Sequence, residues 1–138
     1  MLSKLLITLG VIVYAGLVPY LEINCSHVFN PSWPPHARFH EVWQLTTNVV
    51  IGLLALWLAW RRADIKTAGI LNIFVMGGVL VAHSLSDSYG GSITSGNVTK
   101  QIAGMEIAVF AAMLVVVLAV IAMVINYLGA KTNPKTLM

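Results

Sequence analysis

The chain has 138 residues, of which 58% are hydrophobic and only 9% charged, so it is more apolar than a soluble domain, in which about half of the residues are apolar. Eight Lys and Arg residues against five Asp and Glu residues give a net charge of +3. The basic residues are scattered along the chain, which excludes the basic patch of a nucleic-acid-binding protein. The one cysteine, Cys25, excludes an internal disulfide or a CxxC redox pair.

Four segments are long and apolar enough to cross a ~30 Å hydrocarbon core, which needs about 20 mostly apolar residues. They predict an all-α fold. The chain would be a polytopic membrane protein whose residues 1–138 form one domain, a bundle of four transmembrane helices. The first segment resembles a secretory signal peptide, but no small-x-small cleavage site follows it, so we expect a retained helix. The expected helices cover about 2–21, 36–60, 66–87 and 102–128.

The basic residues are distributed unevenly between the two sides of this bundle. Two of them, Arg38 and Lys100, fall in or near the expected outer loops. The positive-inside rule therefore predicts that both termini are cytoplasmic, and a multi-pass protein of the cytoplasmic membrane if the source is bacterial. Two N-glycosylation sequons, at Asn24 and Asn97, would lie outside. The other six basic residues, which fall on the expected cytoplasmic side, are Lys4, Arg61, Arg62, Lys66, Lys131 and Lys135.

The second helix begins in the polar stretch Asn30–Trp43, where Pro34 and Pro35 suit a helix's first turn. His36 and His40 are four residues apart and share a helix face, which continues through Trp43, Gln44 and Thr47. Glu41 lies on a different face, toward Arg38 and Asn48.

The other three helices also carry polar residues toward the outer side. The third ends with His83 and Asp87, which antiparallel packing would place level with His40 and His36. The first ends at Glu22, and the fourth begins near Glu106. Because ionisable groups avoid lipid and find partners or line wet cavities, these residues predict a shared pocket in the outer half. Its expected members are Glu22, His36, Arg38, His40, Glu41, His83, Asp87 and Glu106.

Two chemical interpretations of this pocket are open. His36, His40 and His83 with Asp87 could hold zinc, copper or iron, although the spacing is not specific and di-iron membrane enzymes use more histidines. Alternatively, the carboxylates of Glu22, Asp87 and Glu106, with His40 or His83 as proton partner, could act by acid/base catalysis. The substrate would be hydrophobic: an isoprenoid, sterol, quinone or lipid. Whether the protein is an enzyme is left open.

A structural interpretation competes with both. An Arg38–Glu41 pair and capping by Asn30 would only hold helices together, Trp33 and Trp43 would be interface anchors, and His27 would be solvated. The fourth helix also has a small-residue face that could pack inside the bundle, form a homo-oligomer or bind a partner, as in a non-catalytic accessory subunit. This face comprises Gly104, Ala108, Ala111, Ala112, Ala119 and Ala122.

The stretch from His27 to Gln44 resembles the signature of an uncharacterised family of small four-helix membrane proteins with an NPxWxxHARFHxxW pattern. The chain is similar to emopamil-binding (EXPERA) and DoxX-like proteins in layout only. The resemblance implies the fold and no activity. The matching positions are Asn30, Pro31, Trp33, His36, Ala37, Arg38, Phe39, His40 and Trp43.

Overall fold

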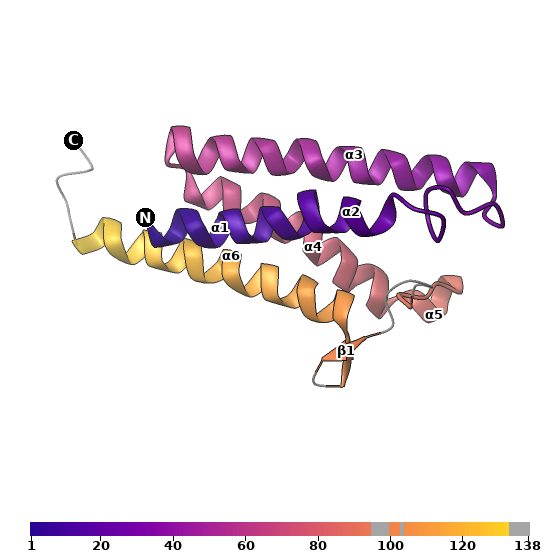
Figure 1. Cartoon of the computed structure of the whole chain (residues 1–138). Helices are drawn as coiled ribbons and strands as arrows, with labels where there is room; N and C mark the ends of the chain where they lie inside the picture. Colours follow the sequence, from indigo (N-terminus) through magenta and orange to yellow (C-terminus); the bar gives the residue numbers. More distant parts are fainter. Residues whose placement is uncertain (95–99, 103, 133–138) are drawn as a thin grey trace.

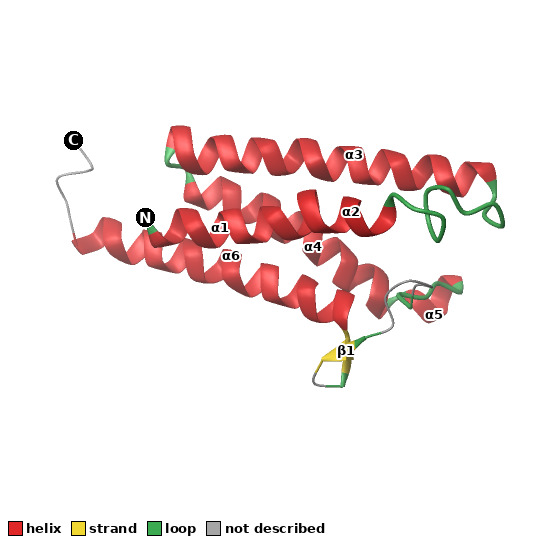
Figure 2. Cartoon of the chain, viewed as in Figure 1, coloured by secondary structure: helices red, strands yellow, loops and turns green. Residues whose placement is uncertain are grey.

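The computed structural model describes residues 1–94, 100–102 and 104–132. Within these ranges four helices are long and apolar enough to cross a membrane, Leu2–Glu22, Pro35–Arg62, Ile65–Ser84 and Ile107–Thr132. They lie side by side as a bundle with little other regular structure (Figures 1 and 2). The predicted all-α, four-helix fold is therefore confirmed. The sequon at Asn97 lies outside the described residues.

Two of the four long helices contain a π-helical turn, and three short elements, one helix and two strands, lie between the third and the fourth long helix. In chain order the elements are α1 (Leu2–Val11), the π-helical turn η1 (Ile12–Leu17), α2 (Val18–Glu22), α3 (Pro35–Trp57), the π-helical turn η2 (Leu58–Arg62), α4 (Ile65–Ser84), α5 (Ser86–Tyr89), β1 (Gln101–Ile102), β2 (Met105–Glu106) and α6 (Ile107–Thr132). β1 and β2 form an antiparallel pair.

Among the helix limits that differ from the sequence-based expectation, two affect the candidate site. The third helix ends at Ser84 because Leu85 leaves the helical conformation (φ −103°, ψ 3°), so Asp87 belongs to the separate helix α5 and does not stack one turn below His83. The fourth helix begins at Ile107 and not near 102. Gly104 has φ +76° and turns the chain between β1 and β2, a conformation that glycine adopts without steric cost.

The bundle has two distinct ends (Figure 1). The terminal end holds the start of α1, the turn between η2 and α4, and the end of α6. The loop end holds the connection 23–34, α5 and the β1–β2 pair. From their shared turn at the terminal end, α3 and α4 diverge toward the loop end.

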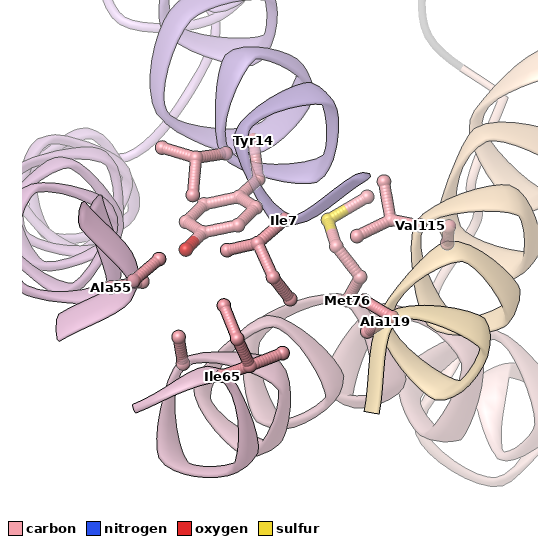
Figure 3. Packing of buried hydrophobic residues seen from close by; sticks show 12 residues of the cluster. Ile7, Tyr14, Ala55, Ile65, Met76, Val115 and Ala119 are labelled. Atoms are coloured by element: carbon pink, nitrogen blue, oxygen red, sulfur yellow. The ribbon is translucent and has the colours of Figure 1, made fainter. Parts of the chain in front are cut away.

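The core is apolar and contains many small residues. Tyr14 of the first helix points toward Ala55 of α3, and Ile7 lies between the helices near Ile65 of α4, in a cluster that Val115 and Ala119 of α6 complete (Figure 3). Small side chains let helix backbones approach closely, which is the main source of packing between membrane helices. Of the small-residue face expected on the last helix, Ala112, Ala119 and Ala122 pack inside the bundle and are fully buried, whereas Ala108 is exposed and Gly104 precedes the helix.

One polar contact crosses this core. Asn72 of α4 is fully buried; its Oδ1 accepts a hydrogen bond of 3.0 Å from the Tyr14 hydroxyl, and its Nδ2 donates to the Ile7 carbonyl at 3.2 Å. Gly10 leaves the room for this amide, because a Cβ there would lie 2.5 Å from Nδ2. Buried polar groups are costly unless paired, and here the amide joins α4 to the first helix.

The outer surface is apolar along the helices and basic at the terminal end. Leu53 and Phe74 are 62% and 71% exposed, which suits contact with lipid rather than water. At the terminal end Lys4 lies 5.5 Å from the Trp60 ring, and Arg62 lies 5.6 Å from Trp57. Aromatic and basic side chains are typical of a membrane–water interface.

The turn at the terminal end allows a prediction about pH. Asp64 caps α4 by accepting a hydrogen bond of 3.0 Å from the Thr67 backbone N–H. Hydrogen bonding from Thr67, with a smaller contribution from Lys66, holds the pKa of Asp64 below its usual 3.8. Because the folded protein holds this proton less tightly than the unfolded chain does, the stabilisation is complete above pH 3.8 and is lost as pH falls below it.

We therefore expect Asp64→Ala to lower stability by about 1 kcal/mol at neutral pH. Asp64→Asn is the matched control, because asparagine caps helices about as well without a charge. It should keep most of the neutral-pH stability and show a flatter stability profile below pH 3.8. Unfolding in mixed micelles at several pH values measures both; equal acid sensitivity in the parent and Asp64→Asn would contradict the assignment.

Candidate functional site

A cavity of about 640 Å³ opens between the helices toward the loop end. Its aliphatic part is formed by the first helix, α3, α4 and the start of α6, and its polar part by Glu22, His27, Glu41 and Glu106. Ligand sites in proteins commonly occupy 300–1,000 Å³ and combine apolar walls with a few polar groups. The remaining lining residues are Val13, Tyr14, Leu17, Val18, Leu21, Ser26, Asn30, Trp33, Gln44, Leu45, Asn48, Met76, Val79, Ser92, Ile93, Thr94, Ile107, Ala108 and Ala111.

The closest pair of ionisable groups in this cavity is His27 with Glu22. Nε2 of His27 lies 2.8 Å from Oε2 of Glu22, and the two side chains are only 10% and 23% exposed. The sequence had indicated that His27 is solvated; this expectation is wrong, because the side chain is buried in the site. This histidine, three residues before the NPxW pattern, is the functional candidate that sequence reasoning missed.

The loop between the first helix and α3 holds the His27 ring in place. Nδ1 of His27 contacts Ser26 Oγ at 2.8 Å, and the Ser26 carbonyl accepts a hydrogen bond from the Asn30 amide at 3.0 Å. Trp33 packs edge-on against the ring, with centroids 5.4 Å apart. Asn30 also accepts from the Ser32 N–H at 3.0 Å. Asn30 and Trp33 of the NPxW segment therefore position His27 at the cavity.

Glu41 lines the cavity because the face of α3 that carries it points into the bundle. The sequence had suggested that the face with His36 and His40 points inward. Gly52 lies against the first helix, where an added Cβ would be 2.6 Å from the Ala15 Cβ. This close approach fixes the rotation of α3, and Glu41, Leu45 and Asn48 follow on the same side at helical spacing. Glu41 is half-buried and lines the cavity, whereas sequence reasoning gave it a scaffolding role with Arg38.

Glu106 comes from β2 and lies on the opposite side of the cavity. Its Oε1 accepts a hydrogen bond of 3.1 Å from Nε2 of Gln101, its partner across the β1–β2 pair. Gln44 and Asn48 of α3 add neutral donors and acceptors to the wall. Of the eight expected pocket members, Glu22, Glu41 and Glu106 are brought together here, and Asn30, Trp33 and Gln44, to which the sequence gave other roles or only a place on a helix face, line the cavity with them.

His36 and His40 lie elsewhere, on the exposed side of α3 at the loop end. Their Nε2 atoms are 3.0 Å apart, and Trp43 stacks on His40 with centroids 5.6 Å apart. All three side chains are exposed, and none of them lines the cavity or the smaller groove between α3 and α4. The helical stripe predicted from the sequence therefore exists, but it faces outward.

His83 lines a smaller groove of about 290 Å³ between the diverging ends of α3 and α4. The groove adjoins the cavity, since both are lined by Gln44, Asn48 and Val79. Asp87, on α5, is exposed and lines neither space.

Arg38 is half-buried, and its Nε is buried without a hydrogen-bond partner. Among the residues that the structure describes, no ion pair joins Arg38 to Glu41. In the same part of the chain, no three His, Cys, Asp or Glu side chains lie close enough to hold a metal ion together. A zinc, copper or iron site at His36, His40, His83 and Asp87 stays a prediction.

Comparison with known proteins identifies the family but no activity. Residues 6–130 match the model of DUF6640, a family of unknown function, and the chain belongs to this family. No protein of curated function and no solved structure matches it.

Proposed function

We propose that this member of DUF6640 binds an amphipathic small molecule in the 640 Å³ cavity, with the hydrophobic part between the helices and the polar part against His27, Glu22 and Glu41. The observation that carries the proposal is the gradient along the cavity walls, from aliphatic side chains to ionisable ones. Isoprenoids, sterols, quinones and lipids share this division into an apolar body and a polar group.

The ionisable residues at the polar end of the cavity suggest a chemical role and not only contact with water. Gathering ionisable residues in an apolar bundle is costly, and interhelical hydrogen bonds there return only about 0.6 kcal/mol on average. A paired histidine and carboxylate is a common acid–base couple. If the bound molecule is converted, we expect His27 and Glu22 to exchange protons with its polar group, in place of the His40, His83 and Asp87 expected from the sequence.

The groove between α3 and α4 supports access from the side. It adjoins the cavity through Gln44, Asn48 and Val79 and lies where the two helices diverge (Figure 1). A lipid-soluble ligand would therefore reach the polar groups from within the bilayer. In the proposed orientation the terminal end is cytoplasmic, as its basic and aromatic residues favour, and the cavity opens in the outer half.

A role as accessory subunit has less support, because Ala112, Ala119 and Ala122, half of the face that would dock a partner, are buried inside the bundle. The same burial disfavours a homo-oligomer through this part of α6.

Filling the cavity tests the proposal. Ala111 lines the cavity on α6, and Ala111→Trp should place an indole where the ligand's apolar part lies. We expect the organic molecule recovered with the purified protein, extracted and quantified by mass spectrometry, to fall about tenfold or more, as occupied volume excludes the ligand.

Val117→Trp is the matched control, since Val117 is 50% exposed on the same helix and lines no part of the cavity. It should leave the recovered molecule unchanged. Should Ala111→Trp not fold, Ala108→Phe fills the same space from a more exposed position. A molecule retained equally by the parent, both cavity variants and the control would refute binding in the cavity.

A further inference from the structure

The charges around the cavity are strongly unbalanced. Among the described residues, three carboxyl groups line it, those of Glu22, Glu41 and Glu106, against one imidazole and no lysine or arginine. Glu22 is paired with His27, and Glu106 accepts a hydrogen bond from Gln101. The lining thus contains more acidic groups than its own side chains neutralise.

Glu41 is the carboxyl group of the three without a hydrogen-bond or ion-pair partner, although the charges of His27 and Glu22 lie near enough to act on it. Throughout residues 1–94, 100–102 and 104–132 no side chain or backbone N–H donates a hydrogen bond to it, and no basic group lies within ion-pairing distance. The side chain is nevertheless half-buried, on a helix apolar enough to cross a membrane. An unpaired carboxylate in such surroundings costs at least about 2.5 kcal/mol unless a partner or water meets it.

An aromatic ring stands at the same end of the cavity. Trp33 lines it, half-buried and held edge-on against His27. The faces of tryptophan rings attract organic cations, and sites for amines and quaternary ammonium groups commonly combine such rings with a carboxylate. The ring and the free carboxyl group are independent features, from the loop and from α3, and both favour a cation.

We infer that the ligand is an amphipathic amine, whose protonated nitrogen binds Glu41 and whose hydrocarbon part occupies the aliphatic walls of the cavity. This inference rests on the proposed function and specifies its ligand class. Fatty acids and phosphate-bearing lipids are disfavoured, because their charge would face three carboxyl groups without a lysine or arginine to offset it.

Three probes with the same tail test the inference: dodecylamine, 1-dodecanol and dodecanoate. Each is titrated into the full-length protein in neutral detergent micelles and followed by calorimetry, with empty micelles as the blank. We expect dodecylamine to bind about tenfold or more tightly than dodecanol, because a hydrogen bond to a charged group is worth more than a neutral one. Dodecanoate should bind most weakly.

Glu41→Gln removes the charge and keeps the shape of the side chain. It should bring the affinity for dodecylamine close to that for dodecanol, while the affinity for dodecanol itself stays unchanged, which also shows that the variant is folded. Asp64→Asn removes a carboxylate at the terminal end and should leave the preference for the amine intact.

An amine preference that persists in Glu41→Gln, or equal binding of amine and carboxylate by the parent, would overturn the inference while leaving a ligand cavity in place. If none of the three probes binds, or if Ala111→Trp does not weaken their binding, the proposed function itself fails. The two outcomes are therefore distinguishable.

Discussion

Asn72→Ala is expected to lower the free energy of unfolding by about 2 kcal/mol. The substitution leaves the buried Tyr14 hydroxyl without its acceptor and a void where the amide lay between the first helix and α4. The loss is measured by unfolding in mixed micelles with increasing sodium dodecyl sulfate. Asn126→Ala is the matched control, because Asn126 is exposed on α6 and its change should be within about 0.5 kcal/mol.

A double-mutant cycle with Tyr14→Phe isolates the hydrogen bond itself. We expect a coupling energy of about 0.6 kcal/mol, the average for interhelical hydrogen bonds in membrane proteins. The larger part of the loss in Asn72→Ala then comes from packing. A variant at Asn72 that is no less stable than the one at Asn126 would show that this contact does not hold the two helices together.

His27→Ala should be the most damaging of the four histidine substitutions, with a loss of about 1–3 kcal/mol. It leaves the Glu22 carboxyl group in the cavity without its 2.8 Å partner and removes the ring on which Trp33 packs. We also expect loss of the molecule recovered with the protein, because both groups line its binding site.

The other three histidines provide the controls. His36, His40 and His83 are exposed, so alanine at each should change stability by no more than about 0.5 kcal/mol. The pair variant with Glu22→Gln and His27→Gln replaces both partners by neutral groups and should recover part of the loss. If His40→Ala were as damaging as His27→Ala, the outward orientation of the α3 histidines would be wrong.

His27 is buried in the cavity and the other three histidines are exposed, a difference that the sequence did not predict. Other features of the fold could be predicted. The number and approximate limits of the long helices follow from apolar runs of sufficient length, since the cost of exposing backbone and charges to lipid leaves few alternatives. Of the polar groups expected to gather toward one end, Glu22, Glu41 and Glu106 line the cavity, whereas His36, Arg38, His40, His83 and Asp87 do not.

The rotation of α3 could not be predicted in the same way. Its sequence offers two polar stripes, one through His36 and His40 and one through Glu41 and Asn48. The choice depends on Gly52, whose missing side chain admits the first helix, and such a contact between distant segments leaves no periodic signal. His27 was missed for a related reason: it lies in a loop, and only the folded loop places it against Glu22.

The π-helical turn η1 has a consequence for sequence comparison. A π-helix closes its hydrogen bonds over one more residue than an α-helix does, so it acts as a one-residue insertion within the first helix. The wider turn absorbs this extra residue, so deleting one residue from Ile12–Leu17 would restore a regular α-helix and leave the orientation of Val18–Glu22 relative to α1 nearly unchanged. Glu22 would then still face His27. Homologues that retain this pair are therefore expected to differ by one residue in the spacing between Gly10 and Glu22 where the π-helical turn is absent.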